Sequence, residues 1–201
     1  QRLPRGQRLL IFALIFGGGL FVIIAITVLL IRGTLTPSDR SIGTALTKDI
    51  TVSQFAMLPD DDSYPAALAV APDGRVYTGS YKTGKLWVIT PDGKVSVVAT
   101  TGEALKAITG LSVAADGSLY IVDQTDADPR TDGGSVKRMA ADGTVTAFAN
   151  ISDGKGFISP DDVTLDAAGH VYVSDRARAE VWRFNSDGSG GNVWWIPPKL
   201  D

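Results

Sequence analysis

The 201-residue sequence contains no cysteine and a single histidine, His170. The absence of cysteine excludes a disulfide framework, a thiolate metal site and a cysteine nucleophile. His170 follows Gly169 at a turn, so we interpret it as a turn residue rather than a general base, with no other histidine to build a triad. The sequence also lacks a GxSxG motif, a phosphate-binding loop and a zinc-ligand spacing.

Positive charge is scarce in the larger part of the chain. From Arg40 to Asp201 there are 15 Lys and Arg against 21 Asp and Glu, a net charge of −6. A nucleic-acid-binding surface needs a basic stripe to neutralise phosphates, and none is present. We therefore predict no nucleic-acid partner.

Charge of either sign is missing from Leu9 to Ile31, a run of 23 residues. At about 1.5 Å rise per residue, a helix of this length crosses a hydrocarbon layer of about 30 Å. We predict a transmembrane helix at 9–31, in contact with membrane lipid and followed by a linker at 32–49. A cleavable signal peptide is the alternative, but its apolar core is usually about 7 to 15 residues.

Three arginines precede this run, at Arg2, Arg5 and Arg8. Positive residues favour the cytoplasmic side, so we predict a cytoplasmic segment at 1–8 and a periplasmic or other extracytoplasmic location for the rest. Ala13 and Gly17 are four residues apart and give a small-xxx-small face on which a partner helix could pack. Ordinary use of glycine in a membrane helix is the alternative.

The remaining chain is built from an internal repeat. Aligning Gly74, Gly117 and Gly169 superimposes three segments with matching apolar positions and a matching tyrosine. The segments are AALAVAPDGRVYTGS, TGLSVAADGSLYIVD and DDVTLDAAGHVYVSD. A second glycine turn follows 19, 26 and 19 residues later, so the middle unit is seven residues longer, within DQTDADPRTDGG.

Each unit contains four short β-rich segments separated by Asp-Gly or Ala-Gly turns. Glycine accepts positive φ, and aspartate bonds the local backbone. A period of about 40 to 50 residues is typical of the four-stranded blades of a propeller. We predict an all-β propeller, with blades at about 64–100, 107–151 and 158–197; a β-sandwich is the alternative.

The units resemble those of the six-bladed SMP-30/gluconolactonase/LRE-like propellers, with relatives among NHL-repeat and strictosidine-synthase-like proteins. The resemblance rests on Ser-Pro-Asp-Asp-Val at 159–163, Val-Tyr-Val-Ser-Asp at 171–175 and Val-Trp-Arg-Phe at 181–184. It implies six blades, of which three are visible within 50–201. We therefore expect either a longer protein or a partner that covers the open flank, and a strand at 52–56 that closes the ring.

In lactonases of this family, the resemblance implies a divalent metal at the mouth of the central channel, held by Glu, Asn and Asp side chains. Oxygen ligands suit Ca²⁺ or another hard divalent cation such as Mg²⁺. Asp161 matches one such position, while the equivalent residues of the other units are Ala66 and Thr109. Asp161 is therefore either a metal ligand or a turn or strand cap.

Asp123 and Asp175 end the second strand of two units, and we expect each to bond the backbone of an adjoining loop. Trp194 and Trp195 are interpreted as a partner-contact patch or as outer-strand packing.

Three functions follow from these features. The first is a membrane-anchored, non-catalytic binding or scaffolding subunit of a membrane protein complex, with no visible cofactor. The second is a metal-dependent lactonase or hydrolase that uses Asp161. The third is a receptor-like propeller that binds a ligand at the channel mouth. The chain favours the first, because enzyme chemistry needs several converging groups and one candidate is present.

Overall fold

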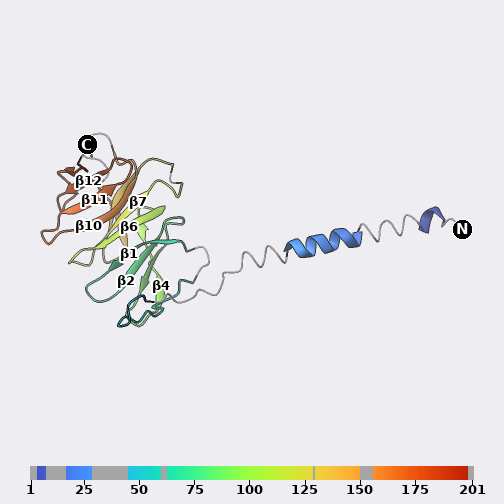
Figure 1. Ribbon diagram of the computed structural model, residues 1–201. Helices are drawn as coiled ribbons and strands as arrows, with labels where there is room; N and C mark the ends of the chain where they lie inside the picture. Colours follow the sequence, from blue (N-terminus) through green and yellow to red (C-terminus); the bar gives the residue numbers. More distant parts are fainter. Residues whose placement is uncertain are drawn as a thin grey trace. The chain divides into compact units, whose positions relative to one another are not determined.

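The computed structural model describes residues 4–7, 17–28, 45–59, 63–128, 130–149 and 156–198. They belong to two units, Gln1–Gln54 and Phe55–Asp201. In the first unit, residues 17–28 form a helix that includes Gly17 (Figure 1). No helix in the described ranges has both the length and the apolar character needed to cross a membrane. The ends of the predicted span, 9–16 with Ala13 and 29–31, lie outside the described residues, so the membrane anchor stays a prediction.

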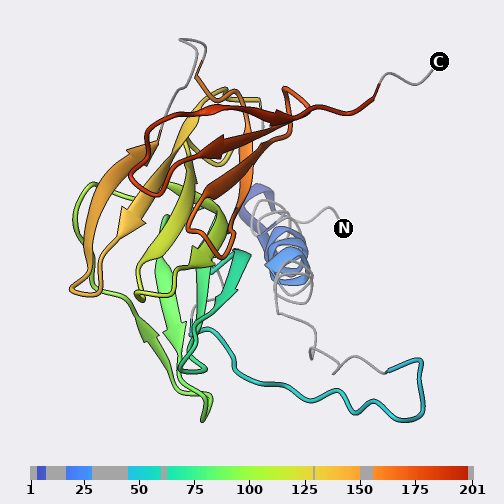
Figure 2. The same ribbon diagram turned by 90° about the vertical axis from the view of Figure 1, so that its left-hand side faces the viewer.

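The second unit is all-β, as predicted, and consists of three sheets (Figures 1 and 2). Each contains four antiparallel strands that are neighbours in chain order. The first sheet contains β1 (Pro65–Val70), β2 (Val76–Ser80), β3 (Leu86–Ile89) and β4 (Val95–Val97). The second contains β6 (Ala107–Val113), β7 (Leu119–Gln124), β8 (Gly134–Met139) and β9 (Thr144–Ala149), with the short β5 (Thr101–Gly102) parallel to β9. The third contains β10 (Pro160–Leu165), β11 (Val171–Asp175), β12 (Glu180–Phe184) and β13 (Asn192–Trp195).

Asp-Gly turns connect several of these strands. They form because glycine accepts positive φ and aspartate bonds the local backbone. At the β6–β7 turn, Gly117 has φ +81°, which a residue with a Cβ rarely adopts. The Asp116 carboxylate accepts the Ser118 amide at 2.9 Å. That hydrogen bond lowers the pKa of Asp116. The same aspartate-to-backbone bond recurs at Asp73, Asp142 and Asp187.

The core lies between the sheets. β6 lies between β1 and β10, so the first strands of the three sheets are neighbours (Figure 1). Residues of β7 alternate between two interfaces: Ile121 packs toward the first sheet, and Val122 packs toward the third. Both side chains are fully buried. The middle sheet is therefore apolar on both faces, as a blade between two blades must be.

A β-bulge interrupts the first strand of each sheet, β1, β6 and β10, at the same place. The register shifts between Pro65 and Ala67 in β1, between Ile108 and Gly110 in β6, and between Pro160 and Val163 in β10. A bulge adds a residue that opposes no partner and redirects its side chain. The repeat thus includes a backbone irregularity that hydrophobic patterning does not show.

Residues 52–56 do not form a strand with any of the three described sheets. A strand exists only as part of a ladder with a neighbour. A closing strand would pair with a further sheet beyond the three that the structure describes. The closing strand therefore stays a prediction.

Candidate functional site

The side of the third sheet that faces away from the second carries an exposed aromatic surface. Tyr172 and Val181 point to this side because their strand neighbours Val173 and Trp182 are buried against the second sheet. Trp194 and Trp195 on β13 are 56% and 48% exposed. We call this surface the outer face of the third sheet, defined by Thr164, Tyr172, Ser174, Val181, Trp194 and Trp195.

Three tyrosines occupy equivalent positions, and their burial differs. Tyr77 and Tyr120 are 8% and 4% exposed, and each belongs to the core formed with the following sheet. Tyr172 is only half-buried. In the described chain, no sheet follows the third one. The repeat position that is buried at Tyr77 and Tyr120 is therefore at the surface at Tyr172.

The aromatic pairing around this tyrosine also repeats. The Tyr120 ring meets Phe148 edge-on, with ring centroids 4.9 Å apart, and the third sheet packs over this pair. The Tyr172 ring meets Trp194 in the same way at 5.0 Å. The outer face of the third sheet is therefore shaped like a surface that another sheet covers elsewhere in the molecule.

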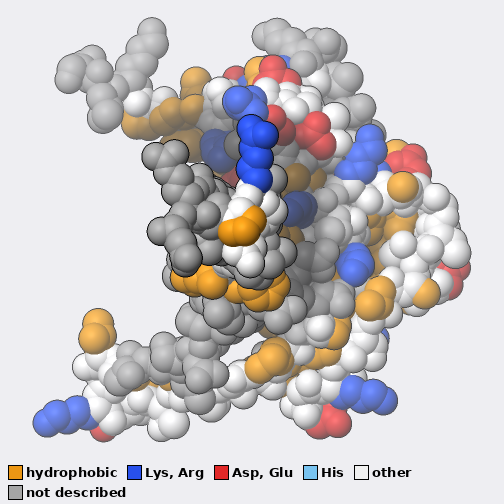
Figure 3. Space-filling view, turned by 90° about the vertical axis from the view of Figure 1, so that its right-hand side faces the viewer, with side chains coloured by type: hydrophobic (Ala, Val, Ile, Leu, Met, Phe, Trp, Pro, Cys, Tyr) orange, Lys and Arg blue, Asp and Glu red, His pale blue; other side chains and the backbone are white. Residues whose placement is uncertain are grey.

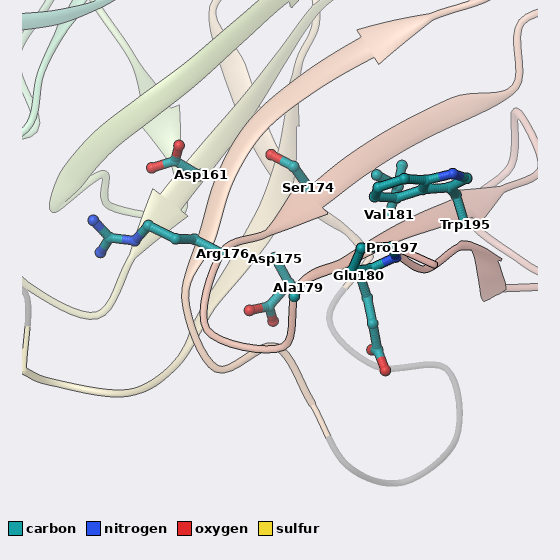
Figure 4. A pocket seen from close by; sticks show the side chains of 9 residues that line it. All are labelled: Asp161, Ser174, Asp175, Arg176, Ala179, Glu180, Val181, Trp195 and Pro197. Atoms are coloured by element: carbon teal, nitrogen blue, oxygen red, sulfur yellow. The ribbon is translucent and has the colours of Figure 1, made fainter. Parts of the chain in front are cut away.

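Two shallow cavities lie on the outer face. One, of about 350 Å³, is lined by apolar side chains that include Tyr172, Val181 and Trp194. The second, of about 240 Å³, is shown in Figure 4 and extends from Trp195 to Asp161. Val181 lines both, so the cavities are parts of one continuous surface.

Asp161 lies in the β10 bulge and is exposed. Its counterpart in β6, Thr109, donates its hydroxyl to the carbonyl of Pro160 in the next sheet, at 3.4 Å. In the repeat, Asp161 therefore occupies the position from which the first strand of a sheet contacts the following sheet. Figure 4 shows its carboxylate at the end of the cavity, near the Arg176 side chain.

In the described part of the chain, Asp161 lies apart from any group of possible metal ligands. Within the described ranges, no three His, Asp or Glu side chains converge to hold an ion. The carboxylate of neighbouring Asp162 accepts the Val163 amide at 2.9 Å. A Ca²⁺ ion takes about six to eight oxygen ligands, so the described set is too small and the predicted role of Asp161 as a ligand stays a prediction.

The strand-end aspartates bond adjoining loops, as expected. Asp123 accepts the amides of Lys106 and Ala107 at 2.7 and 2.9 Å. Asp175 accepts the amides of Ile158 and Ser159 at 2.7 and 3.1 Å. Each carboxylate is almost fully buried, so each fixes the loop that enters the first strand of its own sheet.

Each of these buried acids has a cationic neighbour, which sequence reasoning did not find. Lys137 Nζ lies 2.8 Å from the Asp123 carboxylate, and Arg178 Nε lies 3.7 Å from that of Asp175. The first sheet has the uncharged Ser80 at this position, whose hydroxyl accepts the amides of Lys82 and Thr83. A buried charge requires a partner. Each unit that has a buried aspartate at this position also has a basic side chain beside it.

His170 belongs to a polar network at the β10–β11 turn. Its Nδ1 lies 2.8 Å from the Asp166 carboxylate, and Arg183 lies 3.0 Å from its Nε2. Tyr172 donates its hydroxyl to the same carboxylate at 3.1 Å. Partial desolvation raises the pKa of Asp166, but hydrogen bonds from the His170 side chain and amide and from Tyr172 outweigh it and lower the pKa to about 2.

This lowered pKa predicts a specific acid sensitivity. The ionised Asp166 stabilises the fold above its usual pKa, 3.8, and that stabilisation is lost as pH falls toward about 2. Asp166→Asn is expected to be less stable than the wild type at pH 6, with the difference shrinking as the pH approaches 2. Urea unfolding midpoints of both proteins across this range measure the effect. A difference that stays constant with pH contradicts it.

Charged side chains are mixed over the surface. Figure 3 shows exposed side chains of both charge signs. Salt bridges such as Arg138 to Asp116, at 2.8 Å, pair some of them.

Comparison with known proteins supports the fold. Streptogramin B lyase superimposes with a TM-score of 0.53 and 16% identity over 71% of this chain and 44% of that one. Virginiamycin B lyase from Staphylococcus aureus gives 0.51 and 16% over 70% and 44%. A putative gluconolactonase gives 0.52 and 21% over 67% and 49%. These are β-propeller proteins, and the three sheets are consistent with part of such a propeller.

In sequence, the chain is 30% identical over 118 residues to low-density lipoprotein receptor-related protein 1 from Pyricularia oryzae. The match covers 58% of this chain and 38% of that protein. No protein-family model matches the chain. The matched part of this chain therefore covers less than half the length of each protein it resembles, and the likeness defines its fold class.

Proposed function

We propose that the chain is a membrane-anchored β-propeller that acts as a non-catalytic binding or scaffolding subunit of a membrane protein complex. The uncharged run at 9–31 supports the anchor. The outer face of the third sheet supports the binding role and carries the proposal, because Trp194 and Trp195 leave large apolar areas in water. Exposed aromatic patches of this kind are typical of interaction sites.

The occupant of this face is a β-sheet of a partner subunit. Where the second sheet has the equivalent Tyr120–Phe148 pair, the third sheet covers it with Val171, Val173 and Trp182. A sheet that presents β-branched and aromatic side chains thus has the right chemistry. The matched part covers 44% and 49% of two similar propeller structures, so folds of this kind contain further sheets.

Replacing both exposed tryptophans with aspartate tests the proposal. The full chain extracted in mild detergent is expected to migrate as a complex larger than a monomer, and the double variant W194D/W195D as a monomer. Its melting temperature is expected to change little, because both side chains are already about half exposed. Ser96→Asp, on exposed β4, is the matched control and is expected to leave the complex intact.

Native mass in detergent and thermal melts provide the measurements. A wild-type chain that is monomeric in mild detergent contradicts the proposal. So does a double variant that retains the wild-type complex.

A metal-dependent lactonase is the second candidate. It is supported by the likeness to a gluconolactonase and by the exposed carboxylate of Asp161 on the β10 bulge. This candidate needs metal ligands other than those in the described part of the chain. Calcium-dependent lactone hydrolysis that Asp161→Asn abolishes would favour it over the binding role.

A further inference from the structure

We propose that the loop end of the second sheet contains a binding site for a small hydroxylated carboxylate, held by Lys106 and Lys137. The site is separate from the outer face of the third sheet and does not depend on the function proposed for that face. It rests on a register comparison, a cavity and the contacts of one buried lysine.

Lys137 replaces a tryptophan. In β3, Trp87 pairs with Thr78, and in β12, Trp182 pairs with Val173; in β8 the equivalent residue, opposite Ile121, is Lys137. The two tryptophans are 0% and 4% exposed, and Lys137 is 7% exposed. The middle sheet therefore has an ammonium group and less side-chain volume where its neighbours have a buried indole.

A cavity of about 350 Å³ lies beside this lysine. One wall comes from Lys106, Asp123 and Lys137, and the other from the β7–β8 loop, including Thr125 and Gly133. This loop belongs to the unit that is seven residues longer than its neighbours. The same sheet thus contains both the replaced tryptophan and the extra loop residues, and both border one cavity of a size typical of small-molecule sites.

The lysine ammonium is held in position by its neighbours. Lys137 Nζ lies 2.8 Å from Asp123 Oδ2, donates to the Ala104 carbonyl, and lies 3.7 Å from Glu103 Oε2. Asp123 also accepts two backbone amides. Because its carboxylate already accepts three donors, it has little capacity to bind a cation in the cavity.

Lys106, the second cationic side chain that lines the cavity, favours the binding of an anion. In the described part of the chain, the Lys106 ammonium has no ion-pair partner. Asp126 and Asp128 lie on the nearby loop but do not line the cavity; Asp126 accepts the Asp128 amide, and Asp128 pairs with Arg130 at 2.8 Å. A carboxylate can accept hydrogen bonds from Lys106 and Lys137, and hydroxyl groups on the same ligand suit the polar lining from Gln124, Thr125 and Ser135.

The test is a calorimetric titration of the full chain in detergent with D-glycerate, and with glycerol as the uncharged match. Saturable binding of glycerate without binding of glycerol at the same concentrations is expected. Lys106→Gln is expected to weaken glycerate binding about tenfold, the effect of one charge-assisted hydrogen bond. Lys94→Gln, at the exposed β3–β4 turn, is the control and is expected to bind as the wild type does.

Lys137→Trp, which restores the residue of the sister sheets and fills the cavity, is expected to abolish binding. If it does not fold, the result for Lys106→Gln decides. The proposal is overturned if the wild type does not bind glycerate saturably, if glycerol binds equally well, or if Lys106→Gln binds glycerate as the wild type does.

Discussion

Asp175→Ala is expected to lower the free energy of unfolding by about 3–5 kcal/mol, the usual effect of removing one partner of a buried charged network. Asp175 is 1% exposed. Its carboxylate accepts the amides of Ile158, Ser159 and Arg178, and the substitution leaves all three without this acceptor. The Arg178 guanidinium, 3.7 Å from the carboxylate through its Nε, also loses this acidic neighbour.

Guanidinium chloride unfolding of the full chain measures this effect. Asp187→Ala is the matched control, because Asp187 is an exposed turn residue of the same third sheet. A small change is expected there. If the two alanine variants unfold at similar denaturant concentrations, Asp175 does not hold the loop in the way its contacts indicate.

Gly110→Ala is expected to lower the free energy of unfolding by about 3 kcal/mol, at the upper end of the range for overpacking. A Cβ at Gly110 would lie 2.6 Å from Asp162 Cα and 2.9 Å from the Asp161 carbonyl oxygen. These are backbone atoms of β10, which cannot move aside as a flexible side chain can. The substitution therefore forces β6 and β10 apart, at the contact between the second and third sheets.

Ser112→Ala is the control, because it changes a residue of the same strand without adding bulk. Thermal melts of both variants test the prediction. Equal stability of Gly110→Ala and the wild type would show that β6 and β10 do not approach as closely as this structure indicates. A loss of stability would also displace Asp161, so any activity that depends on Asp161 should fall with it.

The repeat predicted the sheets well, because its information is local. Alternation of apolar residues over a few positions defines a strand, and Asp-Gly pairs such as Asp116–Gly117 define turns. The strand-end roles of Asp123 and Asp175 also followed from alignment, since both positions recur at the same place in a unit. Residues 52–56 resemble the last strand of each unit but form no strand here, because pairing depends on a neighbouring strand, which sequence similarity alone does not supply.

The candidate sites were less predictable. Lys137 and Asp123 are 14 residues apart, and only the antiparallel pairing of β7 with β8 brings them together. Arg183 and His170 meet across β11 and β12 in the same way. The alignment of Lys137 with Trp87 and Trp182 was available in the sequence, but its meaning depended on knowing that this side of the sheet is buried.

By itself, the sequence determined the all-β character, the order of strands and turns, and the uncharged run at 9–31, since these depend on residue type and short-range spacing. The tertiary structure decided which side of each strand is covered. Tyr77, Tyr120 and Tyr172 occupy the same position of the repeat. Tyr77 and Tyr120 nevertheless lie in the core, whereas Tyr172 lies at the surface. Burial depends on whether another sheet packs against that side, which is a long-range property that no local pattern encodes.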